Sequence, residues 1–481
     1  MTISASRENE RLNYISTRGE ASPLGFEDVL LAGLARDGGL YVPETWHKLA
    51  PETIADLAGK PFADVAVEVM HPFMGGAISR EELHVMAADA FGRFGHRAVT
   101  PLVQVGPSRW VLELFHGPTL AFKDVAMQLL ARLMDHVLKK RGQRATIIGA
   151  TSGDTGGAAI EAFRGSERVD VVIFFPEGRV SDVQRRMMTT PTDANIHAVA
   201  VKGHFDDCQA LVKGMFNDHA FRDRNAISGV NSINWARIAG QVTYYFAAGA
   251  ALGAPERALS FVVPTGNFGD IFAGYVAKQM GLPIDRLVIA SNVNDILPRT
   301  LSSGVYEMRE VVATSSPSMD IQISSNFERY LFEASGRDAA LIRAKMRALA
   351  QGGRFELGDL AEPLLDDFGA AAASETDVAT AIRGLKDECG YLVDPHTACA
   401  VVAADAVLGR DGKTPQVILS TAHPAKFPDA MEKITGMRPT LPARLASLMT
   451  DKERITTIGN DLVEAERHVE ALTRVTEEGR A

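Results

Sequence analysis

The sequence contains little cysteine and no long hydrophobic run. Three cysteines occur among its 481 residues, and no two of them form a CxxC pair. Such usage does not favour a disulfide framework or a cysteine-rich zinc site, and it is typical of a reducing compartment. The most apolar stretches, such as residues 244–254, are shorter than the roughly 20 residues that cross a membrane. The first residues also lack the basic-then-apolar order of a signal peptide, so we expect a cytoplasmic protein.

The sequence also lacks an excess of positive charge. Lys and Arg total 50 against 60 Asp and Glu, which gives a formal net charge of −10. Nucleic acids and anionic membranes are not attracted to a negative field, so we expect neither as a partner. A small anionic ligand is not excluded, because it responds to charges within about one Debye length, on the order of 10 Å. With 46% hydrophobic and 23% charged residues, the composition is that of a folded globular protein.

Short apolar segments alternate with helical patterns along most of the chain. Continuous apolar strands that alternate with helices are typical of a parallel sheet covered on both faces. We expect strands at 145–150, 169–175, 196–201, 260–263, 287–290 and 417–419, and helices at 123–140, 156–163 and 271–280. Two further helical patterns, at 338–351 and 370–388, predict an additional lobe.

Lys123 lies at the expected start of a helix, after a Gly-Pro turn. A cation at this end opposes the helix macrodipole, and the apolar neighbours Leu120 and Phe122 indicate a desolvated setting. Both effects lower the pKa of an amine, and Schiff-base chemistry needs a neutral amine. The alternative interpretation is a solvated lysine paired with Asp124 or another acid.

Two glycine-rich loops each follow an expected strand. In PTGNFGD, residues 264–270, glycines let the backbone approach a ligand, and the next helix offers free N–H groups to an anion. In GATSGDTGG, residues 149–157, several hydroxyls could receive a carboxylate or phosphate. A tight turn and ordinary helix capping are the alternative interpretations. Two such cradles predict a ligand with two anionic groups, or two ligands.

Motifs in a fixed order along the chain resemble those of the threonine synthase family. They are GPTLAFKD at 117–124, GATSGDTGG at 149–157, PTGNFGD at 264–270 and STAHPAKF at 420–427. Further matches, NYISTRG at 13–19, DGGLYVP at 37–43 and GVNSINWAR at 229–237, extend the resemblance over most of the chain and indicate the longer, microbial and fungal form. The resemblance implies an α/β pyridoxal-phosphate fold of the tryptophan-synthase β-like type, fold type II. It has two parallel-sheet lobes, an N-terminal lead domain and extra helices.

The resemblance also implies a domain organisation and an activity. Residues 1–95 would form an N-terminal threonine-synthase-type domain and 441–481 a C-terminal helical tail. Residues 96–440 would form the catalytic domain, with a mainly helical insertion at about 325–390. The activity would be the last step of threonine biosynthesis, a lyase reaction that converts O-phospho-L-homoserine and water to L-threonine and phosphate. The partner is then a small-molecule substrate, and monomer and homodimer both stay open.

Roles for individual residues follow from the resemblance. Lys123 would form the Schiff base with pyridoxal 5′-phosphate and move protons. Thr421 would lie against the pyridine nitrogen, with Ser420 the second choice, and a neutral hydroxyl there favours elimination and replacement chemistry. Asp154 would lie beside the ring oxygen of the cofactor. The cofactor phosphate would be bound by Gly266, Asn267, Phe268 and Gly269 with Thr265 and Asp270 flanking, and the substrate carboxylate by Thr151, Ser152 and Thr155.

Some assignments stay open at this point. The clamp for the substrate phosphate has four unranked candidates: Arg179, Arg185, Arg186 and Lys202. No metal is expected, and we interpret His396 and His423 as structural. A serine/threonine dehydratase or cysteine synthase of the same fold is the near alternative, and Asp154 and the long N-terminal lead favour threonine synthase over it. A non-catalytic phosphate-metabolite binding protein is the alternative from another class.

Overall fold

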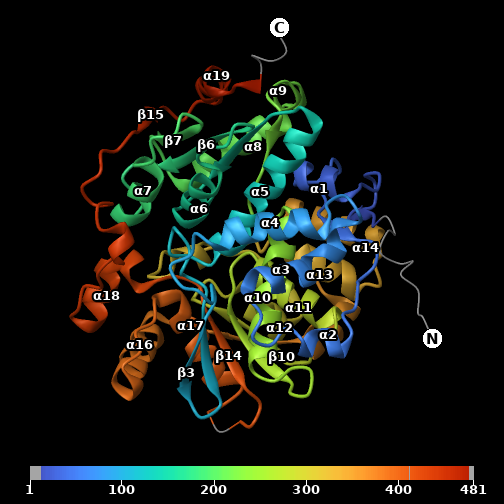
Figure 1. Cartoon of the computed structure of the whole chain (residues 1–481), viewed down its shortest axis with the longest axis vertical. Coiled ribbons are helices and arrows are strands. Elements are labelled where there is room, and N and C mark those ends of the chain that lie inside the picture. The colour runs from blue at the N-terminus through green and yellow to red at the C-terminus, as the bar shows by residue number, and fades with distance from the viewer. Residues whose placement is uncertain (1–11, 411, 476–481) are drawn as a thin grey trace.

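The structure, a computed structural model, describes residues 12–410 and 412–475 of the chain. Two large sheets form the centres of two lobes, which lie one above the other in Figure 1. One sheet has the strand order β15-β7-β6-β5-β8 and the other β13-β10-β9-β14-β4-β3. The predicted two-lobed α/β architecture is confirmed. The prediction about a signal peptide concerns residues that lie outside the described part of the chain.

The five-stranded sheet is parallel throughout. Its central strand, β6, is buried at every position, as expected for a strand covered on both faces. Val171, Ile173 and Phe175 pack into the main core on one face, whereas Val172 and Phe174 pack on the other against helices α8 and α19. The elements of this lobe are β5 (Ala145–Ala150), α6 (Asp154–Phe163), β6 (Val169–Pro176), α7 (Asp182–Thr189), β7 (Ile196–Val201), α8 (Phe205–Asn217), β8 (Ile227–Ser228), β15 (Thr456–Ile458) and α19 (Leu462–Leu472).

The six-stranded sheet is parallel apart from the hairpin of β3 and β4 at its edge. Helix α11 packs on one face, and α17 crosses the other. This sheet consists of β3 (Leu102–Gly106), β4 (Arg109–Glu113), β9 (Leu259–Pro264), β10 (Ile284–Ser291), β13 (Phe368–Ala372) and β14 (Gln416–Ser420). Its helices include α11 (Gly269–Gln279), α16 (Glu375–Cys389) and α17 (Pro395–Val407).

The helical prediction over 370–388 is wrong at its start. The segment from Phe368 to Ala372 forms β13, which pairs in parallel register with β10. The helix α16 begins only at Glu375, after Ser374 has capped it by accepting a hydrogen bond from the N–H of Asp377. A run of alanines favours a helix locally, but pairing with a sheet edge far away in the sequence overrides that preference.

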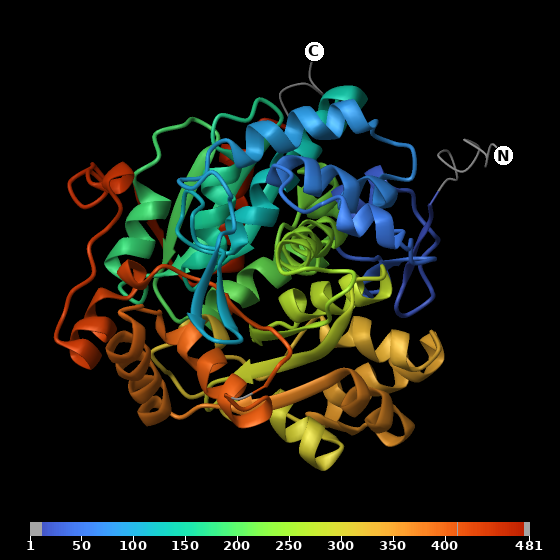
Figure 2. The same cartoon turned by 60° about the horizontal axis from the view of Figure 1, so that its bottom comes forward.

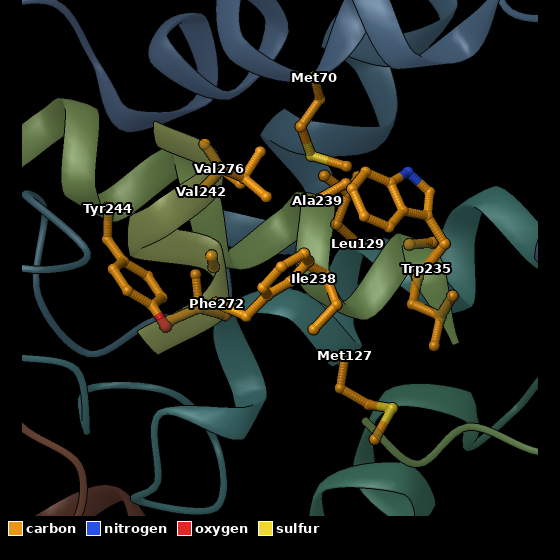
Figure 3. Close-up of a cluster of buried hydrophobic side chains, with 14 of the residues drawn as sticks. Met70, Met127, Leu129, Trp235, Ile238, Ala239, Val242, Tyr244, Phe272 and Val276 are labelled. Atoms are coloured by element: carbon orange, nitrogen blue, oxygen red, sulfur yellow. The ribbon is translucent and has the colours of Figure 1, made fainter. Parts of the chain in front are cut away.

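Helix α10 (Trp235–Ala251) is the centre of the hydrophobic core. Its side chains are surrounded by those of α3 (Phe62–Met70), α5 (Lys123–Arg141) and α11, as Figure 3 shows around Ile238 and Val242. Gly240 lets α10 approach α5 closely, because a Cβ there would lie 3.0 Å from that of Ala126. Helix α3 belongs to the N-terminal segment, which also contains β1 (Tyr14–Ser16), α1 (Phe26–Ala32), β2 (Tyr41–Pro43) and α4 (Arg80–Phe91). The N-terminal segment is therefore packed on the core shared by both lobes.

The C-terminal segment crosses from the lobe of the six-stranded sheet, the large lobe, to that of the five-stranded sheet, the small lobe. After α18 (Pro428–Thr435) it runs along the side of the molecule, red in Figures 1 and 2, to β15 and α19. The tail predicted as helical thus also contributes a strand. The proposed domain boundaries at about 95 and 440 remain predictions. Among the described residues, no helix is long and apolar enough to span a membrane.

Candidate active site

The predicted site residues lie where the parallel strands of both sheets end and their helices begin. Open α/β sheets bind ligands at this edge. Strand β5 leads through 151–153 into α6, and β9 leads through 265–268 into α11. Strand β14 ends at Ser420, and the next residues pair with the segment before Lys123 through a bridge between Ala121 and Ala422.

Lys123 is the first residue of α5, and it is held against the end of β14. The N–H of Phe122 donates to the carbonyl oxygen of Thr421 at 2.9 Å. Burial lowers the pKa of the Lys123 amine, and the nearby cations Lys426 and Arg237 lower it further against the effect of Asp154. The desolvated setting expected from the apolar neighbours is confirmed, because the Lys123 side chain is only 12% exposed.

Asp124 is not the partner of Lys123. Its carboxylate accepts hydrogen bonds from the N–H and the hydroxyl of Thr119, both at 2.7 Å. In the alternative interpretation, the pairing with Asp124 is therefore wrong, and the other acid that Lys123 contacts is Asp154. Burial raises the pKa of Asp124 to about 6, and its two bonds to Thr119 fix the turn that precedes α5.

The partner of Lys123 is Asp154, the first residue of α6. Its Oδ2 lies 3.5 Å from Lys123 Nζ, and its Oδ1 lies 2.6 Å from Nζ of Lys426. Gln184 Nε2 donates to Oδ1 at 2.9 Å, and Ser318 Oγ donates to Oδ2 at 3.1 Å. Burial alone would raise the pKa of Asp154, but Lys426 and Lys123 hold it well below its usual range. Asp154 is therefore a carboxylate with four polar partners.

Loop 264–270 is shaped as an anion cradle. The carbonyl oxygen of Gly266 accepts from Ser324 Oγ at 2.5 Å, and that of Asn267 accepts from the N–H of Asn326 at 3.0 Å. With these carbonyls held outward, the N–H groups of residues 266–270 donate to no other described residue. A Cβ on Gly266 would lie 3.0 Å from the carbonyl oxygen of Ser318, and one on Gly269 would lie 3.3 Å from Asn326 Nδ2. The glycines therefore keep this loop open and close to its supports.

The side chains of Thr265 and Phe268 in this loop have their contacts with other parts of the chain. The Thr265 hydroxyl donates to the carbonyl oxygen of Val263 at 2.6 Å, and the Phe268 ring packs against other aromatic rings. Phe268 also has a φ of 62°, which turns the backbone into α11. These residues can thus serve an anion only through their backbone, as was expected for Phe268.

Asp270 has its carboxylate inside the interface of α10 and α11. Oδ1 accepts from the hydroxyls of Tyr244 at 2.5 Å and Tyr245 at 2.9 Å. Burial raises the pKa of Asp270 to about 6, although both hydroxyls and Lys123 act in the opposite direction. A contribution of Asp270 to cofactor binding stays a prediction, and the geometry leaves it the backbone N–H.

In loop 149–157 one hydroxyl group bonds the loop's own backbone, and two others have no bond to a described residue. Thr151 Oγ1 accepts from the N–H of Gly153 at 2.9 Å and of Gly156 at 3.0 Å, so this hydroxyl organises the loop. Ser152 is exposed and Thr155 half-buried. Neither of the latter two hydroxyls bonds another described residue, so they are the free donors of the loop. Binding of the substrate carboxylate by these three residues stays a prediction.

The hydroxyl of Thr421 is also free of bonds to described residues, although the residue is only 5% exposed. Ser420 Oγ instead lies 3.1 Å from Thr397 Oγ1, which favours Thr421 as the group beside a ligand.

His396 contacts Asp394 Oδ2 through Nδ1 at 2.7 Å, and its Nε2 accepts from the N–H of Ser318 at 3.2 Å. His423 Nδ1 accepts from the N–H of residue 425 at 3.1 Å. Both histidines have the structural contacts that were expected.

The four candidate phosphate clamps lie outside this cluster of contacts. Arg185 and Arg186 form ion pairs with Glu453 of the C-terminal segment, and Arg179 and Lys202 are exposed. Sequence reasoning missed the cation Arg237, which is 2% exposed. Arg237 Nη1 donates to a backbone carbonyl at 2.8 Å, its Nε has no partner, and the guanidinium pairs with no described carboxylate.

Lys426 was the second functional residue to be missed. Both Arg237 and Lys426 lie in motifs that carried the resemblance, so membership of those motifs was the available signal. Burial lowers the pKa of Arg237 to about 10. A buried cation with unused hydrogen-bonding capacity is suited to an anionic ligand.

Three family models match the chain and together span most of it. "Threonine synthase N terminus" matches residues 13–91, "Pyridoxal-phosphate dependent enzyme" matches 94–421, and "Threonine synthase, C-terminal" matches 397–469. The chain is 50% identical to a threonine synthase from Pseudomonas aeruginosa over 463 residues, which cover 95% of this chain and 98% of the relative.

Solved structures give the same result. A pyridoxal-phosphate-bound threonine synthase from Brucella melitensis matches with a TM-score of 0.93 and 57% identity, over 96% of this chain and 100% of that one. The yeast threonine synthase matches with a TM-score of 0.91 and 37% identity, over 97% of this chain and 99% of that one. A threonine deaminase from Solanum lycopersicum, with a TM-score of 0.51 and 12% identity over 82% of this chain and 95% of that one, shares the fold alone.

Proposed function

We propose how this chain, which belongs to the threonine synthase family, divides the reaction of that family among its own residues. The protein is a pyridoxal-phosphate-dependent lyase that converts O-phospho-L-homoserine and water to L-threonine and phosphate. The observation that carries the residue assignment is the position of Lys123. Its poorly solvated amine lies at the strand ends between two loops that can each bind an anion.

The residues fit a phosphorylated cofactor. The N–H groups of residues 266–270 donate to none of the described residues, and the start of α11 adds the positive end of a helix dipole for a phosphate. A Cβ at Gly266 or Gly269 would press on the supports of this cradle. Lys123 would hold the cofactor at its aldehyde carbon, and Thr421 would present a neutral hydroxyl to the pyridine nitrogen. When bound, pyridoxal phosphate supplies an electron sink that lets the α- and β-carbons of the substrate lose protons.

Proton movement in this site is assigned to Lys123 Nζ. A neutral amine can accept the α-proton and the β-proton in turn, and it can return one proton to the γ-carbon after phosphate has left and one to the α-carbon at the end. The proton that water releases when its oxygen bonds to the β-carbon leaves with the phosphate. Ser152 and Thr155 bind the substrate carboxylate through their free hydroxyls, while Thr151 holds the loop in shape.

Arg237 is the side chain that we assign to the substrate phosphate. It is buried, it is close enough to lower the pKa of Lys123, and its Nε has no partner among the described residues. A charge-assisted bond to a leaving phosphate is stronger in such a desolvated place than at the surface. The four unranked candidates from the sequence are either paired with Glu453 or exposed.

The reaction test uses O-phospho-L-homoserine with the purified protein and added pyridoxal phosphate. Threonine and phosphate should appear in equal amounts. Release of phosphate without threonine would indicate another lyase of this fold. A colourless protein that binds the substrate without turnover would indicate a phosphate-metabolite binding protein.

A further inference from the structure

Two buried lysines compete for one carboxylate in the candidate active site. Lys426 Nζ lies 2.6 Å from Asp154 Oδ1, whereas Lys123 Nζ lies 3.5 Å from Asp154 Oδ2. The side chain of Lys426 is 1% exposed and that of Asp154 is 6% exposed. Lys426 ends the short helix η4 (Pro424–Lys426), which follows β14 in the large lobe, and Asp154 begins α6 in the small lobe. The shorter ion pair therefore joins the two lobes.

Both members of the shorter pair are fixed by further bonds. Lys426 Nζ also donates to the carbonyl oxygen of Thr119 at 2.8 Å, in the turn that precedes Lys123. Asp154 Oδ1 accepts a second bond from Gln184 Nε2 at 2.9 Å. The carboxylate is thus oriented so that Oδ1 is occupied and Oδ2 is turned toward Lys123.

This cluster contains two lysines and only one carboxylate, and Lys123 is the lysine farther from that carboxylate. Coulomb energy at low dielectric rises steeply as distance falls, so the pair at 2.6 Å retains its charges in preference to the one at 3.5 Å. The remaining lysine is then the group that most readily gives up a proton. Arg237 also acts on the pKa of Lys123 and His396 on that of Asp154, while Lys123 lowers the pKa of Asp270 and Lys426 lowers that of Asp124.

The neighbouring acids do not replace Asp154 as partner for Lys123. Asp124 is bonded to Thr119, and Asp270 is bonded to two tyrosine hydroxyls. Neither forms an ion pair with a described lysine. Arg237 adds a positive charge that further disfavours a protonated Lys123.

We propose that Lys426 is a positioning residue, whose ammonium neutralises and orients Asp154 so that Lys123 presents a neutral amine. This role rests on the proposed function of Lys123 as the residue that holds the cofactor. Loss of the Lys426 charge would leave Asp154 free to stabilise a protonated nitrogen at Lys123. The nitrogen would then be less able to bond carbon or to accept the α-proton at neutral pH.

A pH titration of the visible band of the holoenzyme tests this role directly. The band changes when the Lys123 nitrogen gains a proton. Lys426→Met should raise the midpoint by about one pH unit or more, a tenfold change in the proton affinity. Lys426→Arg, which keeps the charge, should titrate close to the wild type. Lys433→Met removes an exposed lysine of α18 and serves as the matched control.

A charge-neutral double variant covers the case in which Lys426→Met does not fold. Asp154→Asn alone should lower the midpoint, because it removes the carboxylate and leaves Lys426. Asp154→Asn combined with Lys426→Met should titrate close to Asp154→Asn alone, because Lys426 acts through Asp154. A difference of about one pH unit or more between these two proteins, or an Arg variant that shifts as far as the Met variant, would overturn the proposal.

A measurement without cofactor separates this proposal from the proposed function. Trace acetylation of the cofactor-free protein, read by mass spectrometry against Lys433, gives the pH midpoint of the Lys123 amine. Lys426→Met should raise that midpoint, and an unchanged midpoint would contradict the role of Lys426. A wild-type protein that shows no visible band with pyridoxal phosphate would contradict the proposed function instead, while the acetylation midpoints still decide the role of Lys426.

Discussion

The guanidinium of Arg237 is buried beside the α5 start, yet its Nε donates to no described residue. A buried cation is costly unless something compensates it. Burial accordingly lowers its pKa to about 10. A bound phosphate would supply the missing acceptor next to Lys123.

Arg237→Met should weaken binding of O-phospho-L-homoserine and leave the visible band of the cofactor in place. Loss of a hydrogen bond to a charged group costs about 1.5–3 kcal/mol, so KM should rise roughly 10- to 100-fold. Steady-state kinetics measure the change, with the exposed Arg257→Met as the control. An unchanged KM would show that another cation binds the substrate phosphate.

Asp270 gives the stability of the protein a defined pH dependence. Its pKa in the folded state is raised to about 6, above the usual value of about 3.9. The stabilisation from its protonated form is therefore complete below about pH 4 and is lost as the pH rises through 6.

Asp270→Asn should remove this dependence. Between pH 5 and 7.5 the free energy of unfolding of the wild type should fall by roughly 1–2 kcal/mol relative to that of the variant. Urea unfolding of both proteins at several pH values measures the difference. If the free energies of unfolding of the two proteins change in parallel with pH over this range, Asp270 is ionised in the folded protein at pH 5.

At the scale of elements, the loop between β5 and α6 depends on one glycine conformation. Gly153 has a φ of 144°, and a Cβ there would lie 2.5 Å from Gln184 Cδ. Gln184 is itself bonded to Asp154. The glycine therefore both permits the backbone turn and leaves space for a side chain that orients the key carboxylate.

Gly153→Ala should lower stability by about 1–3 kcal/mol, because a side chain at this φ is strained and displaces Gln184. Gly157→Ala is the matched control, since its Cβ, inside α6, would make ordinary contacts with Met187 at 3.7 Å and Met188 at 4.0 Å. The control should be neutral or stabilise the helix by about 0.5–1 kcal/mol. Thermal unfolding measures both, and equal losses would show that the conformation of Gly153 is unimportant.

The sequence predicted those elements whose pattern is local. Strand 145–150 and the helix from Lys123 were recovered almost to the residue, because apolar runs and helix periodicity mark them. Strand β13 was missed because the alanines of FGAAA carry no strand pattern, and only pairing with β10 makes them a strand. A local sequence pattern does not predict such pairing between distant segments.

The same limit applies to the candidate site. Lys123 and both glycine-rich loops were found from local signals, since a helix start and a strand-loop-helix unit can be recognised in sequence. Lys426 was missed because its ion-pair partner, Asp154, lies 272 residues earlier in the sequence. Arg237 was missed because its burial depends on the packing of α10 against α3, α5 and α11, which local sequence does not show.

At the scale of the whole molecule, the C-terminal segment completes the five-stranded sheet. Strand β15 pairs with β7 at the sheet edge. Beyond α19, Arg474 Nε donates to the buried carboxylate of Asp170 at 2.6 Å. Strand β7, covered in this way by β15, does not offer its backbone groups to other chains.

Arg474→Ala should destabilise the protein and leave catalysis nearly unchanged. The buried Asp170 carboxylate loses a charged partner, which costs about 1–3 kcal/mol. The exposed Arg467→Ala on α19 is the control. Urea unfolding together with kcat at saturating substrate measures both effects, and a large loss of kcat would mean that the C-terminal segment also shapes the site.

The central claim is that Lys123 holds the cofactor while Lys426 remains an ion-pair partner of Asp154. Reduction of the holoenzyme with borohydride makes the cofactor–lysine bond permanent, and peptide mass spectrometry then locates it. The predicted result is a phosphopyridoxyl group on the peptide that carries Lys123 and on no other. A modified Lys426, or an unmodified Lys123 in a yellow protein, would contradict the claim.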